Sequence, residues 1–414
     1  MTKPAQQHRN WRPLVALETA TLVSAAGNGV ALVALPWVVL ELTGSAADVG
    51  LVAAAAAVPL VLSAFVAGTI VDRFGRRRTA VVSDILSGIS IAAIPIAASL
   101  GALSLWLLVA LAAIGAAFDP AGVTARETML PAAAGSARLR RERVNGVHEA
   151  VFGVAFLVGP ALGGLLIAWI GAAATLWATT IGFAASAVVS WLVRLPGVER
   201  PSHGDGPRPI WQDGLEGLAF VWRDRTLRTL TILFTILVGA WVPIEGVILP
   251  VYFQAQDAPE RLGIVLMAMS VGGIVGALGY GAIGHRVRRR TAVLVGLIGT
   301  ALPVVGMAFL PRYWLLVLLG AATGLLYGPI NPIANLVLQE LAPSHLLGRA
   351  IGVLTSLAYA AGPVGFLLVG PLIELVGLRA TFLALALVLV GVALAAPFVR
   401  ALRGLDDART TVRP

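Results

Sequence analysis

The stretch Gly68-Thr69-Ile70-Val71-Asp72-Arg73-Phe74-Gly75-Arg76-Arg77-Arg78 is a short basic segment between two long apolar runs. A second copy of its pattern begins 213 residues later, as Gly281-Ala282-Ile283-Gly284-His285-Arg286-Val287-Arg288-Arg289-Arg290. In both copies a glycine precedes an acid or histidine by four residues, an arginine follows, and three arginines end the segment. Thr-Ala-Val comes directly after each copy. The sequence is therefore a doubled unit, and the basic segments mark equivalent places in its halves.

The composition is that of a membrane protein. Of the 414 residues, 58% are hydrophobic and 12% are charged, and the mean hydropathy is +0.88, which fits no soluble globular class. Cysteine is absent, which excludes disulfides, thiol catalysis and thiolate metal sites. The five histidines are scattered without the spacing of metal ligands, so we expect no metal and no cofactor.

Twelve apolar runs are long enough to cross about 30 Å of hydrocarbon at about 1.5 Å per helical residue. They predict an all-α membrane protein with twelve transmembrane helices in two pseudo-symmetric six-helix halves. We expect an N-terminal half at 1–195, a cytoplasmic linker at 196–226 and a C-terminal half at 227–414. Within the linker, 211–224 reads as a short amphipathic helix on the membrane surface. The runs are 14–42, 49–71, 79–100, 103–123, 146–169, 173–194, 227–253, 262–284, 291–310, 313–337, 350–373 and 378–399.

The basic residues gather at one end of the predicted bundle. A net charge of +9 could suggest a nucleic-acid partner, but these residues lie between apolar runs and not on a soluble module, so we expect none. If both termini are cytoplasmic, 27 of the 30 Lys and Arg residues are inside, and only Arg261, Arg312 and Arg379 are outside. This bias predicts a multi-pass protein of the cell membrane with both termini in the cytoplasm.

The two halves align beyond the basic segments. The matching pairs are Asp119-Pro120 with Asn331-Pro332, Arg143 with Arg349, Gly146 with Gly352, Gly171 with Gly377, and Thr175 with Thr381. Chance does not produce such a series in register. Two six-helix repeats of this kind are a transporter architecture, in which the substrate is held between the halves near the middle of the membrane.

The basic segment between the second and third runs resembles the loop signature of the major facilitator superfamily, Gly-x-x-x-Asp-Arg-x-Gly-Arg-Arg/Lys. The matching residues are Gly68, Asp72, Arg73, Gly75, Arg76 and Arg77. The resemblance implies a cytoplasmic gate, in which Gly68 lets two helices approach and Asp84 and Glu127 are acidic partners. From its place in the third run, we expect Asp84 to form a structural ion pair with the arginines at 76–78. The alternative is a generic basic stop after a membrane span.

A second signature lies in the fifth run. Gly159-Pro160-Ala161-Leu162-Gly163-Gly164 resembles the helix-bend motif of the superfamily's exporters, because proline removes a backbone hydrogen bond and glycines admit a neighbouring helix. Packing of small residues is the alternative. With Ser24-Ala25-Ala26-Gly27-Asn28-Gly29 and Phe118-Asp119-Pro120-Ala121-Gly122, nearly the whole chain resembles the actinobacterial Tap-type multidrug efflux pumps. That resemblance implies proton-driven export of drugs such as tetracycline and aminoglycosides.

Polar residues within the apolar runs are candidates for the site, because charge is costly inside a membrane. Glu245 lies deep in the seventh run with no basic residue within two turns. We expect it to carry a proton or bind substrate, with a structural hydrogen bond as the alternative. Asp119 is either a second carboxylate of the cavity, sharing proton coupling, or a member of a gate ion pair. Cavity residues from the other runs are Asn28 and, in the tenth run, Tyr327, Asn331 and Asn335, which together with Gln339 form a polar stripe with a spacing of four residues.

Two departures from the family pattern limit which residues can couple transport to protons. The group often carries Asp where Asn28 stands, so that position cannot be assigned a titrating role. Many drug/proton antiporters have an arginine four residues before a glycine in the fourth helix, whereas Leu111 precedes Gly115 here. Proton coupling is therefore expected at Glu245 and Asp119.

The sequence favours a secondary drug/proton antiporter that works by alternating access, as a monomer in the lipid bilayer, on small amphipathic drugs. The nearest rival is an exporter of an endogenous metabolite or siderophore. A third reading is a membrane-embedded enzyme or receptor. The sequence contains no nucleophile and base pair, phosphate loop or extramembrane catalytic domain that would support it, so we expect no enzyme.

Overall fold

The computed structural model describes residues 10–195, 210–284, 286–341 and 347–403, and this part of the chain is helical with no strand. The first six transmembrane helices agree with the predicted runs, except that the fourth extends well beyond residue 123. Helices of 21 to 33 residues are long enough to span a bilayer. They are α1 (Arg12–Thr43), α2 (Ala46–Phe74), α3 (Arg76–Ser99), α4 (Leu105–Ala137), α5 (Arg141–Ile170) and α6 (Ala172–Leu192).

The C-terminal half also makes six crossings, two of which are interrupted. The seventh crossing is α8 (Arg225–Pro243), the π-helical turn η1 (Ile244–Ile248) and α9 (Leu249–Gln254), and the tenth is α12 (Tyr313–Tyr327) with α13 (Ile330–Leu341). The others are α10 (Pro259–Ile283), α11 (Arg289–Ala308), α14 (Leu347–Val376) and α15 (Leu378–Ala395), followed by the short 3₁₀ turns η2 (Ala396–Phe398) and η3 (Arg400–Arg403). Eleven described helices meet the length and hydropathy of a span, and α14 supplies the twelfth crossing.

The predicted doubling is visible in local geometry. Gly171 joins α5 to α6 with φ +81°, and Gly377 joins α14 to α15 with φ +87°, a region that glycine enters without a steric penalty. The hydroxyl of Thr175 donates to the Gly171 carbonyl at 2.8 Å, and Thr381 donates to the Gly377 carbonyl at 3.0 Å. The aligned sequence positions therefore build the same turn in both halves.

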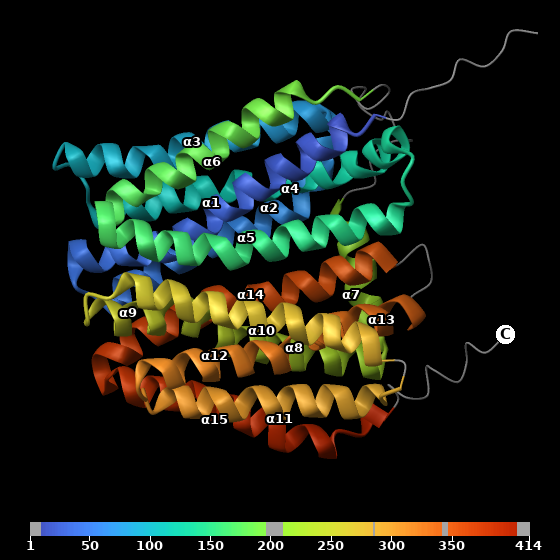
Figure 1. Ribbon diagram of the computed structural model, residues 1–414. Coiled ribbons are helices and arrows are strands. Elements are labelled where there is room, and N and C mark those ends of the chain that lie inside the picture. Colours follow the sequence, from blue (N-terminus) through green and yellow to red (C-terminus); the bar gives the residue numbers. More distant parts are fainter. Residues whose placement is uncertain (1–9, 196–209, 285, 342–346, 404–414) are drawn as a thin grey trace, which may run out of the picture.

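The two halves lie against each other as separate bundles, blue to green and yellow to red in Figure 1. They meet where α2 packs on α14 and α5 packs on α10. Glycines allow this approach: an added Cβ at Gly50 would lie 2.3 Å from the Phe366 carbonyl oxygen, and one at Gly164 would lie 2.4 Å from that of Pro259. These contacts lie toward the end of the bundle opposite the termini.

Toward the termini, α2 leaves this interface. Leu62 is 62% exposed and Phe65 46% exposed, and an added Cβ at Gly68 would meet no atom within 4 Å. The prediction that Gly68 allows two helices to approach is therefore wrong for this structure, because the halves meet at the other end of α2.

The amphipathic helix of the linker is present as α7 (Ile210–Arg223), but it does not lie only on a membrane surface. It packs on α14, and its Val221 is fully buried. Leu218 and Phe220 also pack against the hydrophobic core. The described part of the apolar face of α7 is thus covered by protein, whereas the side chains of 211–215, with Trp211 and Leu215 of the expected face, lie outside the described part of the chain.

Candidate functional site

Glu245 lies in the irregular middle of the seventh crossing. The π-helical turn η1 surrounds it, with Pro243 just before the turn and Pro250 just after it. Proline cannot donate a backbone hydrogen bond, so two prolines seven residues apart disturb the regular helical pattern between them. Isolated π-turns occur frequently at functional sites. The sequence contained this signal, but the expected run was continuous.

A cavity of about 300 Å³ between the halves is lined by Glu245. The residues around it come from α1 and α5 on one side and from α10 on the other. They are Leu32, Gly153, Phe156, Pro160, Leu266, Ser270, Gly273 and Ile274. The hydroxyl of Ser270 also donates to the Phe156 carbonyl at 3.2 Å across the interface. The only acidic group of this lining is therefore placed where both halves can act on it.

Two aromatic side chains connect Glu245 to the tenth crossing. The side chain of Trp241, one turn before Glu245, lies close to its carboxylate. Trp241 stacks on Tyr327, with ring centroids 5.4 Å apart and planes 8° apart. Tyr327 thus contacts the neighbour of Glu245 but does not itself line this cavity, and the contribution of Trp241 was not predicted.

The rest of the predicted stripe in the tenth crossing is divided by a helix break. Helix α12 ends at Tyr327 and α13 begins at Ile330, because Pro329 lacks a donor and Gly328 accommodates the close backbone of α10. An added Cβ at Gly328 would lie 2.3 Å from the Gly273 carbonyl oxygen. Asn331 is exposed beyond the break, and the side chain of Asn335 lies outside the described residues. The expected polar stripe therefore does not run along one continuous helix.

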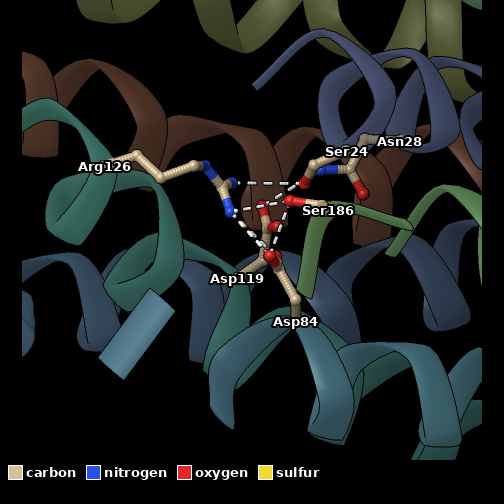
Figure 2. Close-up of polar contacts among 6 residues, drawn as sticks. All are labelled: Ser24, Asn28, Asp84, Asp119, Arg126 and Ser186. Atoms are coloured by element: carbon tan, nitrogen blue, oxygen red, sulfur yellow. Dashed lines mark hydrogen bonds and ion pairs between the residues drawn. The ribbon is translucent and has the colours of Figure 1, made fainter. Parts of the chain in front are cut away.

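The N-terminal half contains a buried ion pair at the meeting of four helices (Figure 2). Nη1 of Arg126 donates to both carboxylate oxygens of Asp84, at 2.9 and 2.8 Å. The Ser186 hydroxyl donates to Asp84 at 2.6 Å, and Nη2 of Arg126 donates to the Ser24 hydroxyl at 3.2 Å. Asp84 is 1% exposed and Arg126 2% exposed. A buried charge pair of this kind needs the additional hydrogen bonds that both serines supply.

This pair corrects the expected partners of Asp84 and Glu127. Asp84 lies two turns inside α3 and faces α4 and α6, so it does not pair with the arginines at 76–78. Glu127 is half-exposed and lies 3.8 Å from His148. Helix α4 therefore does carry a buried arginine, but it is Arg126 and not the position of Leu111.

Asn28 and Asp119 lie beside that ion pair in Figure 2. Nδ2 of Asn28 donates to Oδ2 of Asp119 at 3.2 Å, and among the described residues Oδ1 of Asp119 is buried without a hydrogen-bond partner. Asp119 was expected to be either a cavity carboxylate or a member of a gate ion pair. Among the described residues it forms no ion pair. The predicted cavity residues thus form two groups, one around Glu245 and one around Asp119.

A second polar cluster of the N-terminal half was not predicted. Nδ1 of His148 lies 3.1 Å from the Glu18 carboxylate, and both side chains are buried. Oε1 of Glu18 has no hydrogen-bond partner among the described residues. Glu18 stands in the polar face of α1, but its pairing with α5 depends on tertiary packing, which the sequence pattern does not encode.

The gate signature lies at the turn between α2 and α3. Gly75 joins α2 to α3 with φ +87°, and its N–H donates to the Val71 carbonyl at 2.9 Å. Asp72 and Arg73 are exposed beside it, while Arg76 and Arg77 are partly buried. The guanidinium of Arg77 donates to the carbonyl of Trp191 in α6.

The residues of the helix-bend motif lie at close helix contacts. An added Cβ at Gly159 would lie 2.8 Å from the Gly29 Cα, and one at Gly163 would lie 3.0 Å from the Val30 carbonyl oxygen. Gly164 meets α10, while α5 remains one helix across Pro160. The motif thus joins α5 to α1 in its own half and to α10 in the other half, as the packing alternative expects.

Comparison with known proteins bears on these features. The pattern of the Major Facilitator Superfamily matches residues 17–279 and 244–412. The multidrug efflux pump Tap of Mycolicibacterium fortuitum is 45% identical over 397 residues, which is 95% of this chain and 97% of that protein. The pump of the same name from Mycobacterium tuberculosis is 45% identical over 403 residues, 97% of this chain and 96% of that protein.

A solved structure has the same fold. A crystal structure of a single-substitution variant of the nucleoside transporter NupG superposes with a TM-score of 0.78 over 94% of this chain and 100% of that one, at 14% sequence identity. The likeness at this identity concerns the fold alone. Because the family pattern extends over both halves and the twelve crossings follow the same architecture, this chain belongs to the major facilitator superfamily.

Proposed function

We propose that the protein is a secondary multidrug exporter that exchanges amphipathic drugs for protons by alternating access. The observation that carries the proposal is Glu245, the carboxylate in a π-helical turn that lines the cavity between the halves. The relatives named as multidrug efflux pumps support drugs as the substrate class. Tetracycline and aminoglycoside types are the substrates to test first, since the sequence resemblance implies them.

The arrangement of the halves supports alternating access. Their contacts gather toward the end opposite the termini, where the Glu374 carboxylate accepts hydrogen bonds from the Ser45 hydroxyl at 2.6 Å and the Ala47 N–H at 3.1 Å. The charge bias supports a cytoplasmic location of the termini. In that orientation the structure represents a state closed to the outside, from which drug enters the cavity on the cytoplasmic side.

Glu245 can serve as the proton-carrying group because, among the described residues, no basic side chain forms an ion pair with its carboxylate, and the neighbouring Trp241 is neutral. In the outward-facing state it takes a proton from the more acidic side. It releases that proton when the cavity opens to the cytoplasm or when a cationic drug occupies the space. Asp119, with one carboxylate oxygen unpartnered, is the second group to examine for coupling.

The proposal is tested with purified protein in vesicles that carry an imposed pH gradient. A gradient should drive accumulation of a tetracycline or an aminoglycoside, and drug addition should move protons in the opposite direction. A protonophore should abolish both. Drug accumulation that does not depend on the pH gradient would overturn proton antiport. Absence of any drug movement, with active protein shown by transport of a cell-derived metabolite, would favour the rival exporter function.

A further inference from the structure

The first turn of α3 and the end of α2 form an arginine-lined pocket at the termini end of the N-terminal half. Its volume is about 510 Å³. Arg76, Arg77 and Arg78 line it together with the aromatic side chains of Phe74 and Trp191. Phe74 is 58% exposed and Trp191 60% exposed. Exposed aromatic rings at the ends of transmembrane helices are typical of the interface between hydrocarbon and water.

Two of the arginines that line this pocket, Arg76 and Arg78, form no ion pair with a carboxylate in the described part of the chain. Asp84 of α3 pairs with Arg126 instead, and the guanidinium of Arg77 donates to the Trp191 carbonyl. The pocket also lies at the N-terminal end of α3, where backbone N–H groups favour an anion. The site therefore suits a phosphate-bearing group.

An apolar groove of about 570 Å³ adjoins the pocket and shares Phe74, Arg78 and Val82 with it. The groove exists because α2 and α3 each pack along α4 but touch each other little. It follows α2 from Arg73 back to Ser63, which is about 15 Å at 1.5 Å per residue. That length is about half of the ~30 Å hydrocarbon thickness, the depth of one leaflet.

The second copy of the basic segment does not offer the same charges. Arg289 is 7% exposed, and Nη2 of Arg290 donates to the Pro397 carbonyl at 2.9 Å. Two of its three final arginines are thus buried or engaged by the protein, whereas in the first copy only Arg77 of the three donates to a described backbone carbonyl, that of Trp191. The pocket with its groove is a feature of the N-terminal half, where a basic lining adjoins an apolar one.

From these observations we infer that the pocket and groove bind one anionic phospholipid, with its phosphate among Arg76, Arg77 and Arg78 and an acyl chain along α2. Basic pockets between transmembrane helices bind acidic headgroups by this chemistry. The inference does not depend on which substrate the transporter carries. It also accounts for the exposed Phe74 and Trp191, which border the headgroup.

The test is lipid binding to the full-length protein in detergent, followed by native mass spectrometry during titration with dioleoyl phosphatidylglycerol. Dioleoyl phosphatidylcholine is the neutral comparison and should bind more weakly. The double variant Arg76→Gln/Arg78→Gln should bind phosphatidylglycerol about thirtyfold more weakly, since each arginine near the surface contributes about fivefold in affinity. The matched double variant Arg286→Gln/Arg288→Gln, from the second copy, should bind as the unaltered protein does.

The groove is tested separately by Val66→Trp, which fills it and leaves every arginine in place. This variant should also lose phosphatidylglycerol binding, and it keeps the inference testable if the arginine variant does not fold. Inorganic phosphate serves as the probe without an acyl chain. Equal binding of both lipids, or undiminished binding by both N-terminal variants, overturns the inference. Competition by inorganic phosphate together with no effect of Val66→Trp shows a free-anion site and also overturns it.

Discussion

Among single residues, Glu245 is expected to have the largest effect on coupling. Glu245→Gln mimics the protonated side chain permanently and keeps its size, so the variant should fold and bind drug. It should lose drug accumulation driven by a pH gradient, because it can no longer exchange a proton. The measurement is drug-induced proton movement in vesicles with an imposed gradient.

The matched control for that experiment is Glu260→Gln. Glu260 lies in the same half but at the start of α10, where its partly exposed side chain forms an ion pair with the neighbouring Arg261 at 4.0 Å. This variant should transport as the unaltered protein does. If Glu245→Gln still concentrates drug with an unchanged dependence on the gradient, Glu245 is structural and Asp119 becomes the next carboxylate to replace.

The buried pair of Asp84 and Arg126 predicts an effect on stability. Arg126→Ala leaves a carboxylate buried without its charged partner, which costs about 3–5 kcal/mol. The thermal unfolding midpoint of the purified protein should therefore fall markedly. Thermal unfolding in detergent, followed by intrinsic fluorescence, measures the shift.

Replacing both partners distinguishes the effect of an unpaired buried charge on stability from the effect of lost side-chain packing. Asp84→Leu/Arg126→Met removes both charges, and apolar replacements of a buried pair are often neutral or stabilising. Its unfolding midpoint should lie above that of Arg126→Ala. A double variant less stable than the single variant would show that the pair matters mainly through its bonds to Ser24 and Ser186.

Side-chain partners were the least predictable feature at this scale. That Glu245 is deep in a span and that Asp84 needs a cation follow from composition alone. That the cation is Arg126 rather than Arg76 depends on how α3 rotates against α4 and α6, which one sequence does not define. Hydrophobic periodicity identifies a buried face, but it does not say which helix covers that face.

Among the elements, the spans were predictable because about 20 apolar residues in succession have few alternatives to crossing a membrane. The prediction failed where a crossing is irregular. Helix α4 ends at Ala137 and not near 123, because it continues through Arg126, whose charge is buried against Asp84. The π-helical turn and the break at Gly328 occur beside prolines, but proline alone does not indicate where a crossing becomes irregular, since α5 continues across Pro160.

The contact between α14 and the start of α2 predicts a shift in conformation. Glu374 of α14 accepts from Ser45, the residue that also caps α2, and from the Ala47 N–H. Glu374→Ala should destabilise closure at the end opposite the termini by about 1 kcal/mol or less, because the carboxylate is exposed. The population of the state open at that end should increase.

The absence of cysteine makes this shift measurable, since spin labels go only to introduced cysteines. Leu100→Cys and Val376→Cys place one label in each half at the relevant end, where both residues are exposed. Glu374→Ala should add longer distances to the measured distribution. Arg379→Ala, a change of charge at the same end, is the control and should leave it unchanged. An unaltered distribution in Glu374→Ala would show that the glycine contacts alone hold the halves together.

For the whole molecule, duplication explains why the architecture could be predicted from the sequence. The conformational state, that is, the relative tilt of the two halves, could not be predicted in this way. Repeated turns at Gly171 and Gly377 define the two halves whatever their relative tilt. The tilt in this structure is set by contacts between the halves, such as Gly50 on Phe366. Under the proposed alternating access these contacts separate in the second state, so one sequence has to be compatible with both tilts and does not specify either alone.

The gate segment gives the last prediction, at the scale of the whole transport cycle. Asp72 is exposed here and lines neither the arginine pocket nor the groove, so Asp72→Asn leaves the proposed lipid site intact. If this segment holds the halves together when the termini end closes, the variant should fold normally but populate that closed state less and export drug more slowly. Spin labels at Val147→Cys and Ile283→Cys, one in each half at that end, should show fewer short distances.

Arg76→Ala should act in the same direction on transport, whereas the second copy should respond less. Its equivalent of Asp72 is His285, which lies outside the described residues, and the exposed Arg288 is available for a matched Arg288→Ala control. The asymmetry follows from charge: only the first copy combines an acid with the arginines, so only there can a carboxylate face a helix N-terminus of the other half. Equal loss of closure and export in Arg288→Ala and Asp72→Asn would show that the copies act symmetrically. Normal export by both Asp72→Asn and Arg76→Ala would remove the gate role of the segment altogether.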